Sequence, residues 1–258
     1  MDPSMHRTQP SDTFPQRDEP HSILLSMTLP RLDALICLVG VESGMRKESR
    51  LVLALDETDG EKALAIAESV SGVVDAVKIN WPLVLSEGPQ MITRLAEFSD
   101  VICDFKVADI PNTVRLIVEN AVSRGASAVI VHAFTGDDSL RAAVDVANGA
   151  EIYSVTEMSH PGAVVFTAKH AEEMARLGVE CGVDGFIAPA TRPERIKLVR
   201  SIVGDRKILS PGVGAQGGKA SDTISAGADY AIVGRAIYGS EDPRASAEAF
   251  AADIRTVL

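Results

Sequence analysis

From Arg50 onward, short runs of apolar and β-branched residues alternate with longer segments rich in Ala, Glu and Leu. The short runs are typical of buried strands and the longer segments of amphipathic helices, so the sequence contains a strand–helix repeat. This repeat constrains the fold more than any other feature. Eight candidate strands carry it: Leu51–Leu55, Ala76–Ile79, Val101–Phe105, Ala128–Val131, Ile152–Val155, Gly185–Ala188, Lys207–Leu209 and Tyr230–Val233.

Eight such units over roughly 200 residues fit a closed (β/α)8 barrel, because strands covered by crossover helices read as continuous apolar runs. An open, doubly wound sheet is the alternative. That fold usually has fewer strands and a Gly-rich turn after the first one, whereas Leu55 is followed by Asp56-Glu57-Thr58-Asp59. We therefore predict an α/β fold, a single TIM barrel with a poorly ordered N-terminal extension.

The first 48 residues differ in character from the rest of the chain. They show no sustained period of 2 or 3.6 and contain Pro3, Pro10, Pro15, Pro20 and Pro30. We predict an extension over 1–48 and a catalytic barrel over 49–258. A segment with little apolar surface cannot offset the entropy of ordering its backbone, so we expect the extension to be mobile and dispensable. Its one apolar stretch, Leu32 to Val41, is too short to span a bilayer as a helix, but it could dock against the bottom of the barrel.

Charge and cysteine content narrow the class of protein. The formal net charge of −11 argues against nucleic acid or an anionic membrane as the main partner, and an anionic small substrate would need a local positive site. Cys37, Cys103 and Cys181 are far apart and have no C-x-x-C spacing, so neither a disulfide framework nor a zinc site is indicated. We expect a cytoplasmic protein with reduced thiols.

Polar and charged residues collect at the ends of the predicted strands. In a barrel of this kind the carboxyl ends of the strands form the face that carries the chemistry. The residues at or just beyond these ends are Asp56, Lys78, Asp104, Lys106, His132, Thr156 to Ser159, Pro211 to Gln216, and Gly234-Arg235. The sequence therefore predicts that seven strand ends converge on one mouth.

Asp104 and Lys106 are two apart on an otherwise apolar strand, so their side chains point to the same face, and Cys103 and Phe105 face the helices. Burying a lone charge is very unfavourable, so these groups need partners or shifted pKa values. Lys78 and Asp56, at neighbouring strand ends, are the natural partners. A structural ion-pair network is the alternative for an isolated Asp-x-Lys, and the clustering at several strand ends favours a functional site.

The run Asp104-x-Lys106-x-x-Asp109, followed by Ile110-Pro111 and Thr113, resembles the motif of the orotidine 5′-phosphate decarboxylase family. The Asp after the first strand and the Lys after the second are matched by Asp56 and Lys78. Further similar segments are Thr156-Glu157-Met158-Ser159-His160-Pro161-Gly162, Pro211-Gly212-Val213-Gly214-Ala215-Gln216-Gly217-Gly218 and Gly234-Arg235-Ala236-Ile237-Tyr238. The resemblance is to the archaeal-type branch, covers about residues 49 to 258, and includes Met45 to Arg50 as a segment similar to the usual family start. It departs from the family at Asn80-Trp81, where a Gly and an aromatic residue are expected.

This resemblance implies decarboxylation of orotidine 5′-phosphate to UMP, in pyrimidine biosynthesis, without a cofactor or a metal ion. It implies an array of four catalytic residues, Lys78, Asp104, Lys106 and Asp109, in which Lys106 faces C6 of the pyrimidine. It also implies a homodimer, with Asp109 and Thr113 acting in the neighbouring subunit's site. The implied substrate-binding residues are Asp56, Thr113, Ser159, Pro211, Gly214, Gln216, Gly234 and Arg235. Among them the resemblance implies Ser159 at the pyrimidine edge, Gln216 between base and phosphate, and Arg235 at the phosphate. It implies that Asp56 and Thr113, together with Lys78, contact the ribose hydroxyls.

Two other functions remain open from the sequence. A metal-dependent sugar-phosphate aldolase or decarboxylase of the same superfamily shares Asp-x-Lys-x-x-Asp, and a barrel that only binds phosphate or serves as an assembly surface is the non-enzymatic reading. Gln216 and the Ser159 segment favour the decarboxylase. We assign no proton-transfer role to His132 or His160, because a single histidine without a carboxylate nearby in the motif is more typical of a supporting hydrogen bond.

Overall fold

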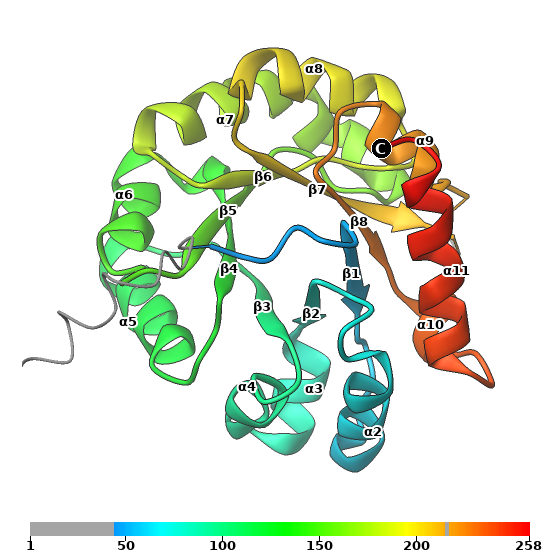
Figure 1. Cartoon of the computed structure of the whole chain (residues 1–258). Helices are drawn as coiled ribbons and strands as arrows, with labels where there is room; N and C mark the ends of the chain where they lie inside the picture. Colours follow the sequence, from blue (N-terminus) through cyan, green and yellow to red (C-terminus); the bar gives the residue numbers. More distant parts are fainter. Residues whose placement is uncertain (1–43, 215–216) are drawn as a thin grey trace, which may run out of the picture. The chain divides into compact units, whose positions relative to one another are not determined.

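The computed structural model describes residues 44–214 and 217–258. Eight parallel strands close into a barrel in the order of the chain, β1 to β8, with helices around the outside (Figure 1). The predicted TIM barrel is confirmed. The extension as far as residue 43, Cys37 and Gln216 lie outside the described residues.

The strands are β1 Leu51–Ala54, β2 Ala76–Ile79, β3 Asp100–Val107, β4 Ala128–His132, β5 Glu151–Val155, β6 Gly185–Ile187, β7 Lys207–Val213 and β8 Tyr230–Val233. The α-helices are α2 Gly60–Val70, α3 Trp81–Glu87, α4 Gln90–Leu95, α5 Pro111–Val122, α6 Asp137–Asp145, α7 Thr167–Cys181, α8 Pro193–Val203, α9 Ala220–Ser225, α10 Arg235–Tyr238 and α11 Pro243–Arg255. Two short 3₁₀ helices, η1 Ala133–Thr135 and η2 Pro161–Val165, follow β4 and β5.

Two apolar cores hold the barrel together. Side chains on the outer faces of the strands pack against the helices, and those on the inner faces, such as Val52, Ile102 and Leu209, fill the barrel interior. Cys103 and Phe105 belong to the outer core and Ile102 to the inner one, as the alternation along this strand predicts. Because both faces are buried, these strands consist of apolar runs instead of alternating polar and apolar residues.

β4 ends one residue later than its apolar run predicts, at His132, and β3 and β7 run further still. β3 ends at Val107 and breaks register against β4 between Cys103 and Val107. β7 continues through Ser210-Pro211-Gly212 to Val213 and breaks register against β8 between Pro211 and Val213. Pro and Gly are poor strand residues in a regular ladder, and an irregularity of this kind accommodates them. The prediction that β7 ends at Leu209 is therefore wrong.

Residues 44–50 cross the bottom of the barrel, in front of the strands in Figure 1. Met45 is buried, and the Asp75 carboxylate accepts the backbone N–H groups of Glu48, Ser49 and Arg50 at 2.7 to 3.1 Å. The Tyr230 hydroxyl donates to the Arg46 carbonyl at 3.0 Å. These residues close the end of the barrel opposite the strands' carboxyl ends. The boundary at residue 48 stays a prediction.

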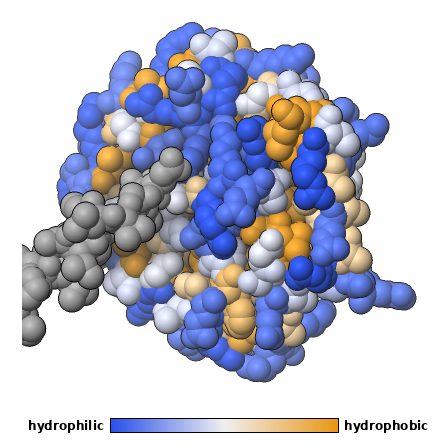
Figure 2. Space-filling view, in the orientation of Figure 1, coloured by the Kyte–Doolittle hydropathy of each residue, from blue (hydrophilic) through white to orange (hydrophobic). Residues whose placement is uncertain are grey.

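Hydrophilic side chains dominate the face drawn in Figure 2, with apolar side chains in separate small patches. Large apolar side chains that are exposed include Ile110, Leu116, Phe134 and Phe166. Across the described parts of the chain, no helix combines the length and the apolar character needed to cross a bilayer.

Candidate active site

A cavity of about 230 Å³ opens at the carboxyl ends of the strands. Eight of the residues that the sequence predicts for the site line it: Asp56, Lys78, Asp104, Lys106, Ser159, Pro211, Gly234 and Arg235. Apolar side chains of the inner core, among them Ile130, Val155 and Ile187, form part of its wall. The structure thus brings most of the predicted residues to one place, from strands spread over the whole barrel.

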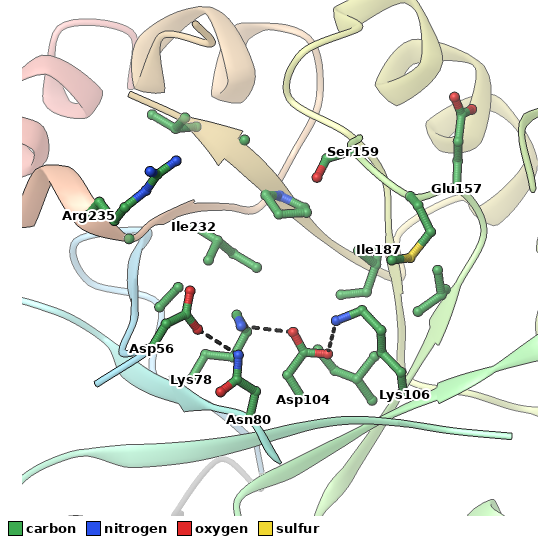
Figure 3. A pocket seen from close by; sticks show the side chains of 18 residues that line it. Asp56, Lys78, Asn80, Asp104, Lys106, Glu157, Ser159, Ile187, Ile232 and Arg235 are labelled. Carbon is green, nitrogen blue, oxygen red and sulfur yellow. Dashed lines mark hydrogen bonds and ion pairs between the residues drawn. The ribbon is translucent and has the colours of Figure 1, made fainter. Parts of the chain in front are cut away.

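Lys78, Asp104 and Lys106 form a row of alternating charges along the floor of the cavity (Figure 3). Lys78 Nζ lies 2.8 Å from Asp104 Oδ2, and Lys106 Nζ lies 2.7 Å from Asp104 Oδ1. Burial raises the pKa of Asp104, but the two ammonium groups outweigh it and hold that pKa below its ordinary value. The carboxylate is therefore ionised and shared by both lysines.

Lys106 differs from Lys78 in its exposure and in its backbone. The side chain of Lys78 is 7% exposed and that of Lys106 is 35% exposed, so Lys106 is the ammonium that a ligand in the cavity can reach. The backbone φ of Lys106 is +45°, in the left-handed region that side chains other than Gly rarely adopt. This residue sits in the register shift of β3, and such a conformation requires support from its surroundings.

Trp81 supplies part of that support. Its indole N–H donates to the Phe105 carbonyl at 2.9 Å, and its ring stacks on Phe105 with centroids 4.5 Å apart. Phe105 directly precedes Lys106, so Trp81 holds the strand where it leaves the regular ladder. The sequence marks Trp81 only as a departure from the family pattern, and its contact with β3 is visible only in the structure.

Asp56 and Asn80 form a second polar pair, on the side of Lys78 away from Asp104 (Figure 3). Asn80 Nδ2 donates to Asp56 Oδ1 at 2.7 Å. The sequence suggests Lys78 and Asp56 as the partners of Asp104 and Lys106. In the structure Lys78 does pair with Asp104, whereas Asp56 hydrogen-bonds to Asn80.

Pro211, Gly212, Val213, Gly234 and Arg235 form the wall of the cavity near β7 and β8. Gly212 has a φ of +107°, which a residue with a Cβ rarely adopts. The following turn is closed by hydrogen bonds from Gly214 N to Gly218 O at 2.8 Å and from Gly218 N to Gly212 O at 3.2 Å. Gly214, a predicted binding residue, does not line the cavity, and its backbone N–H donates to Gly218 within this turn.

The segment that carries Ser159 is fixed by a buried carboxylate that the sequence prediction misses. Glu157 is 1% exposed; Arg192 Nε donates to its Oε1 at 2.9 Å and Arg195 Nε to its Oε2 at 2.6 Å. Arg192 also donates to the Met158 carbonyl at 2.7 Å. A buried carboxylate needs such compensation, so the segment after β5 is tied to the start of α8. Two features of the sequence could have indicated these ion pairs: the acidic residue in Thr156-Glu157-Met158-Ser159, and the two arginines in Arg192-Pro193-Glu194-Arg195.

Asp109 and Thr113 do not line the cavity of their own chain. Asp109 is exposed beyond β3, with its backbone carbonyl held by the Ser139 hydroxyl at 2.6 Å, and Thr113 is partly buried in the first turn of α5. Their predicted roles belong to a neighbouring subunit's site, and those roles stay predictions.

His132 lies at the end of β4 close to the charged row. Burial and, to a smaller extent, the positive charge of Lys106 together lower the pKa of His132 to about 4, against the opposing effect of Asp104. The imidazole is therefore neutral at pH 7, and its ring packs against Phe134 with centroids 4.7 Å apart. Within the described residues, no group of three or more His, Cys, Asp or Glu side chains is arranged to hold a metal ion.

Comparison with known proteins identifies the family. The model of the orotidine 5′-phosphate decarboxylase / HUMPS family matches residues 49–250. Orotidine 5′-phosphate decarboxylase of Methanococcoides burtonii is 56% identical over 207 residues, which are 79% of this chain and 96% of that protein. The Methanosarcina mazei protein of the same name is 54% identical over 217 residues, 83% of this chain and 99% of its own.

Solved structures agree with this result. Orotidine 5′-phosphate decarboxylase of Pyrococcus horikoshii superposes with a TM-score of 0.75 at 48% identity, covering 80% of this chain and 99% of that one. Orotidine 5′-monophosphate decarboxylase of Methanocaldococcus jannaschii, complexed with the inhibitor BMP, gives 0.76 at 42% identity and covers 81% and 99%. With a family model matched over most of its length and relatives more than half identical, this chain belongs to the orotidine 5′-phosphate decarboxylase / HUMPS family.

Proposed function

We propose that this protein decarboxylates orotidine 5′-phosphate to UMP, without a cofactor, as a step of pyrimidine biosynthesis. The observation that carries the proposal is the Lys106 ammonium, reachable from the cavity and held 2.7 Å from a carboxylate that it shares with Lys78. The names of the relatives, all orotidine 5′-phosphate decarboxylases, support it. The two free cysteines among the described residues, Cys103 and Cys181, support a cytoplasmic location.

The chemical difficulty in this reaction is the charge left behind on carbon. When the bond between C6 and the carboxylate breaks, its electron pair stays on C6, and the pyrimidine ring offers no sink for it. A fixed ammonium group opposite C6 stabilises that charge without reorganising. Lys106 then gives a proton to C6, which completes UMP, and recovers a proton from solvent after CO₂ has left.

The partners of Lys106 determine where the substrate carboxylate lies. Asp104 occupies the place beside Lys106 that this carboxylate must approach, so two negative charges face each other until CO₂ forms. Differential stabilisation of the transition state raises the rate, so we treat this repulsion as secondary. Ile130, Val155 and Ile187 form an apolar wall of the same cavity, which suits neutral CO₂ better than the carboxylate that precedes it.

A spectrophotometric assay for the loss of orotidine 5′-phosphate absorbance, run with and without excess EDTA, tests the proposed function. The decarboxylase should turn over equally in both, because no step requires a divalent cation. Activity that stops in EDTA and returns with added Mg²⁺ would instead identify the metal-dependent alternative. If the protein binds UMP but turns over no substrate under either condition, the non-enzymatic alternative, a barrel that only binds phosphate, would be correct.

Arg235 is the proposed phosphate contact. The loss of activity on replacing it should therefore be large for a substrate that carries a phosphate and small for one that does not. Arg235 is exposed at the mouth of the cavity, and a guanidinium offers a two-pronged, charge-assisted contact to a phosphate. Arg235→Ala should lower kcat/KM for orotidine 5′-phosphate by about 10²-fold, while residual activity on orotidine stays nearly unchanged. Arg255→Ala removes an exposed arginine from the last turn of α11 and is the matched control. Equal losses on both substrates would refute the phosphate role.

We also propose a homodimer in which Asp109 and Thr113 complete the neighbouring subunit's site. Asp109 is exposed and does not line the cavity of its own chain, and a carboxylate with no partner in its own site fits a role across an interface. Ile110 is 65% exposed, Leu116 56% and Phe134 62%, all in the segments that follow β3 and β4. Exposed apolar side chains of this size are typical of an interface that excludes water.

Mixing two inactive variants tests the shared site. Lys106→Ala and Asp109→Ala should each be nearly inactive as homodimers. If Asp109 acts in the partner's site, a heterodimer has one site with both defects and one site with neither. Refolding an equal mixture should therefore restore about a quarter of the parent turnover, given random pairing. If both residues act within one chain, every site keeps a defect and the mixture stays inactive.

A further inference from the structure

Asn80 lines the cavity and has no role in the reaction described so far. It follows Lys78 by two residues at the end of β2, and its Nδ2 donates to Asp56 Oδ1 at 2.7 Å. A hydrogen bond from an amide to a carboxylate is charge-assisted and stronger than one between neutral groups. Asn80 is thus a direct partner of a proposed ribose-binding residue.

Asn80 lies at the start of α3, where its side chain could instead cap the helix, so its hydrogen bond to Asp56 is informative. Asn80 is the N-cap of α3, with a φ of −140° and a ψ of −174°, where an asparagine side chain ordinarily accepts a backbone N–H of the first turn. Here the side chain makes no capping bond. Its Oδ1 is buried and has no hydrogen-bond partner within the described residues. Oδ1 is the atom that would accept the capping bond, so Asn80 forgoes that interaction and keeps the one that its Nδ2 makes with Asp56.

We propose that Asn80 is a positioning residue, which orients the Asp56 carboxylate to accept a hydrogen bond from a ribose hydroxyl. With Oδ1 of Asp56 fixed by the amide, Oδ2 is left to accept from the ligand. The same bond keeps Asp56 away from Lys78, whose ammonium already pairs with Asp104 at 2.8 Å. The inference rests on the proposed function only for the identity of the nucleotide, because the contact concerns the ribose and not the reacting carbon.

Calorimetric titration with UMP tests this role without requiring turnover. Asn80→Ala should weaken UMP binding about tenfold, as expected for the loss of one hydrogen bond to a charged group. Asp56→Ala should weaken it at least as much. The double variant should bind no more weakly than Asp56→Ala alone, because Asn80 acts through Asp56. Additive losses in the double variant would overturn the inference.

Asn80→Asp is the isosteric counterpart and replaces the donor by a second carboxylate. Repulsion between the two carboxylates should turn Asp56 away, so this variant should bind UMP more weakly than Asn80→Ala. In the decarboxylation assay, Asn80→Ala should raise KM about tenfold and change kcat by less than about threefold, since the ribose contact is present in both ground and transition states. A fall confined to kcat would contradict the positioning role.

Asp242→Ala provides a crossed control. Asp242 is the exposed N-cap of α11, and its side chain accepts the Ala245 N–H at 2.9 Å, so its loss should lower the thermal midpoint and leave UMP binding unchanged. Asn80→Ala removes no capping bond, so it should weaken UMP binding and leave the thermal midpoint unchanged.

If the parent turns over substrate but Asn80→Ala binds UMP as tightly as the parent, the Asn80 inference fails and the function stands. If the parent binds UMP without turning over orotidine 5′-phosphate, the function fails, and the double-variant comparison still decides the role of Asn80.

Discussion

Replacing Lys106 by alanine is expected to lower the turnover of orotidine 5′-phosphate by about 10³-fold or more while leaving UMP binding measurable. The ammonium acts mainly on charge that develops at C6 in the transition state, and UMP carries no such charge. The loss should therefore appear in kcat and only weakly in the UMP dissociation constant. Single-turnover kinetics and a UMP titration on the same protein preparation would measure both.

Lys207 is the matched control for this substitution. Its side chain is 25% exposed, against 35% for Lys106, and each lysine pairs with a carboxylate. Lys207 begins β7 and pairs with Glu151 at the start of β5, at the opposite end of the barrel from the cavity. Lys207→Ala should reduce stability and keep kcat. Comparable catalytic rates in Lys106→Ala and the parent would refute the proposed role of Lys106.

Replacing Asp104 by asparagine is expected to damage both stability and turnover. The carboxylate is buried between two ammonium groups at 2.7 and 2.8 Å, and an amide of the same shape can accept from only one of them while turning its own N–H groups toward the other. Because Lys78 is itself buried, its charge is left without a counter-ion, and the free energy of unfolding should fall by about 3–5 kcal/mol. Turnover should fall by at least about 10²-fold, because Lys106 loses the group that holds it opposite C6.

Denaturant unfolding curves would measure the stability effect, with Glu248→Gln as the control. Glu248 pairs with Arg244 on the surface of α11, where both side chains are about half exposed, so its loss should change the free energy of unfolding by less than about 1 kcal/mol. The folded-state pKa of Asp104 lies below the ordinary value of 3.8, so its contribution is present at neutral pH and is lost as the pH falls below about 4. An Asp104→Asn protein as stable as Glu248→Gln would show that the two lysines find other partners.

The sequence by itself determined the repeat, the barrel and most of the site. Ala76–Ile79 and Tyr230–Val233 begin and end as their apolar runs predict, because a strand buried on both faces must be apolar along its length. Lys78, Asp104 and Lys106 could be placed together because the carboxyl ends of parallel strands meet at one face of a barrel. The alternation of side chains along β3 likewise follows from local geometry.

The tertiary structure alone decided which of these charges pair and how the reactive lysine is held. Lys106 adopts a left-handed backbone conformation at a register shift of β3. Trp81 supports this site by its hydrogen bond to Phe105, which is 24 residues away in the sequence. Asn80 reaches Asp56 across 24 residues, and Glu157 reaches Arg192 across 35. Such contacts depend on which side chains the closed barrel brings within reach, and a local pattern of apolar and polar residues carries no information about distant partners. The physical reason is that strand and helix periods are set within a few neighbouring residues, whereas the orientation of a buried charge is set by whatever compensates it in space.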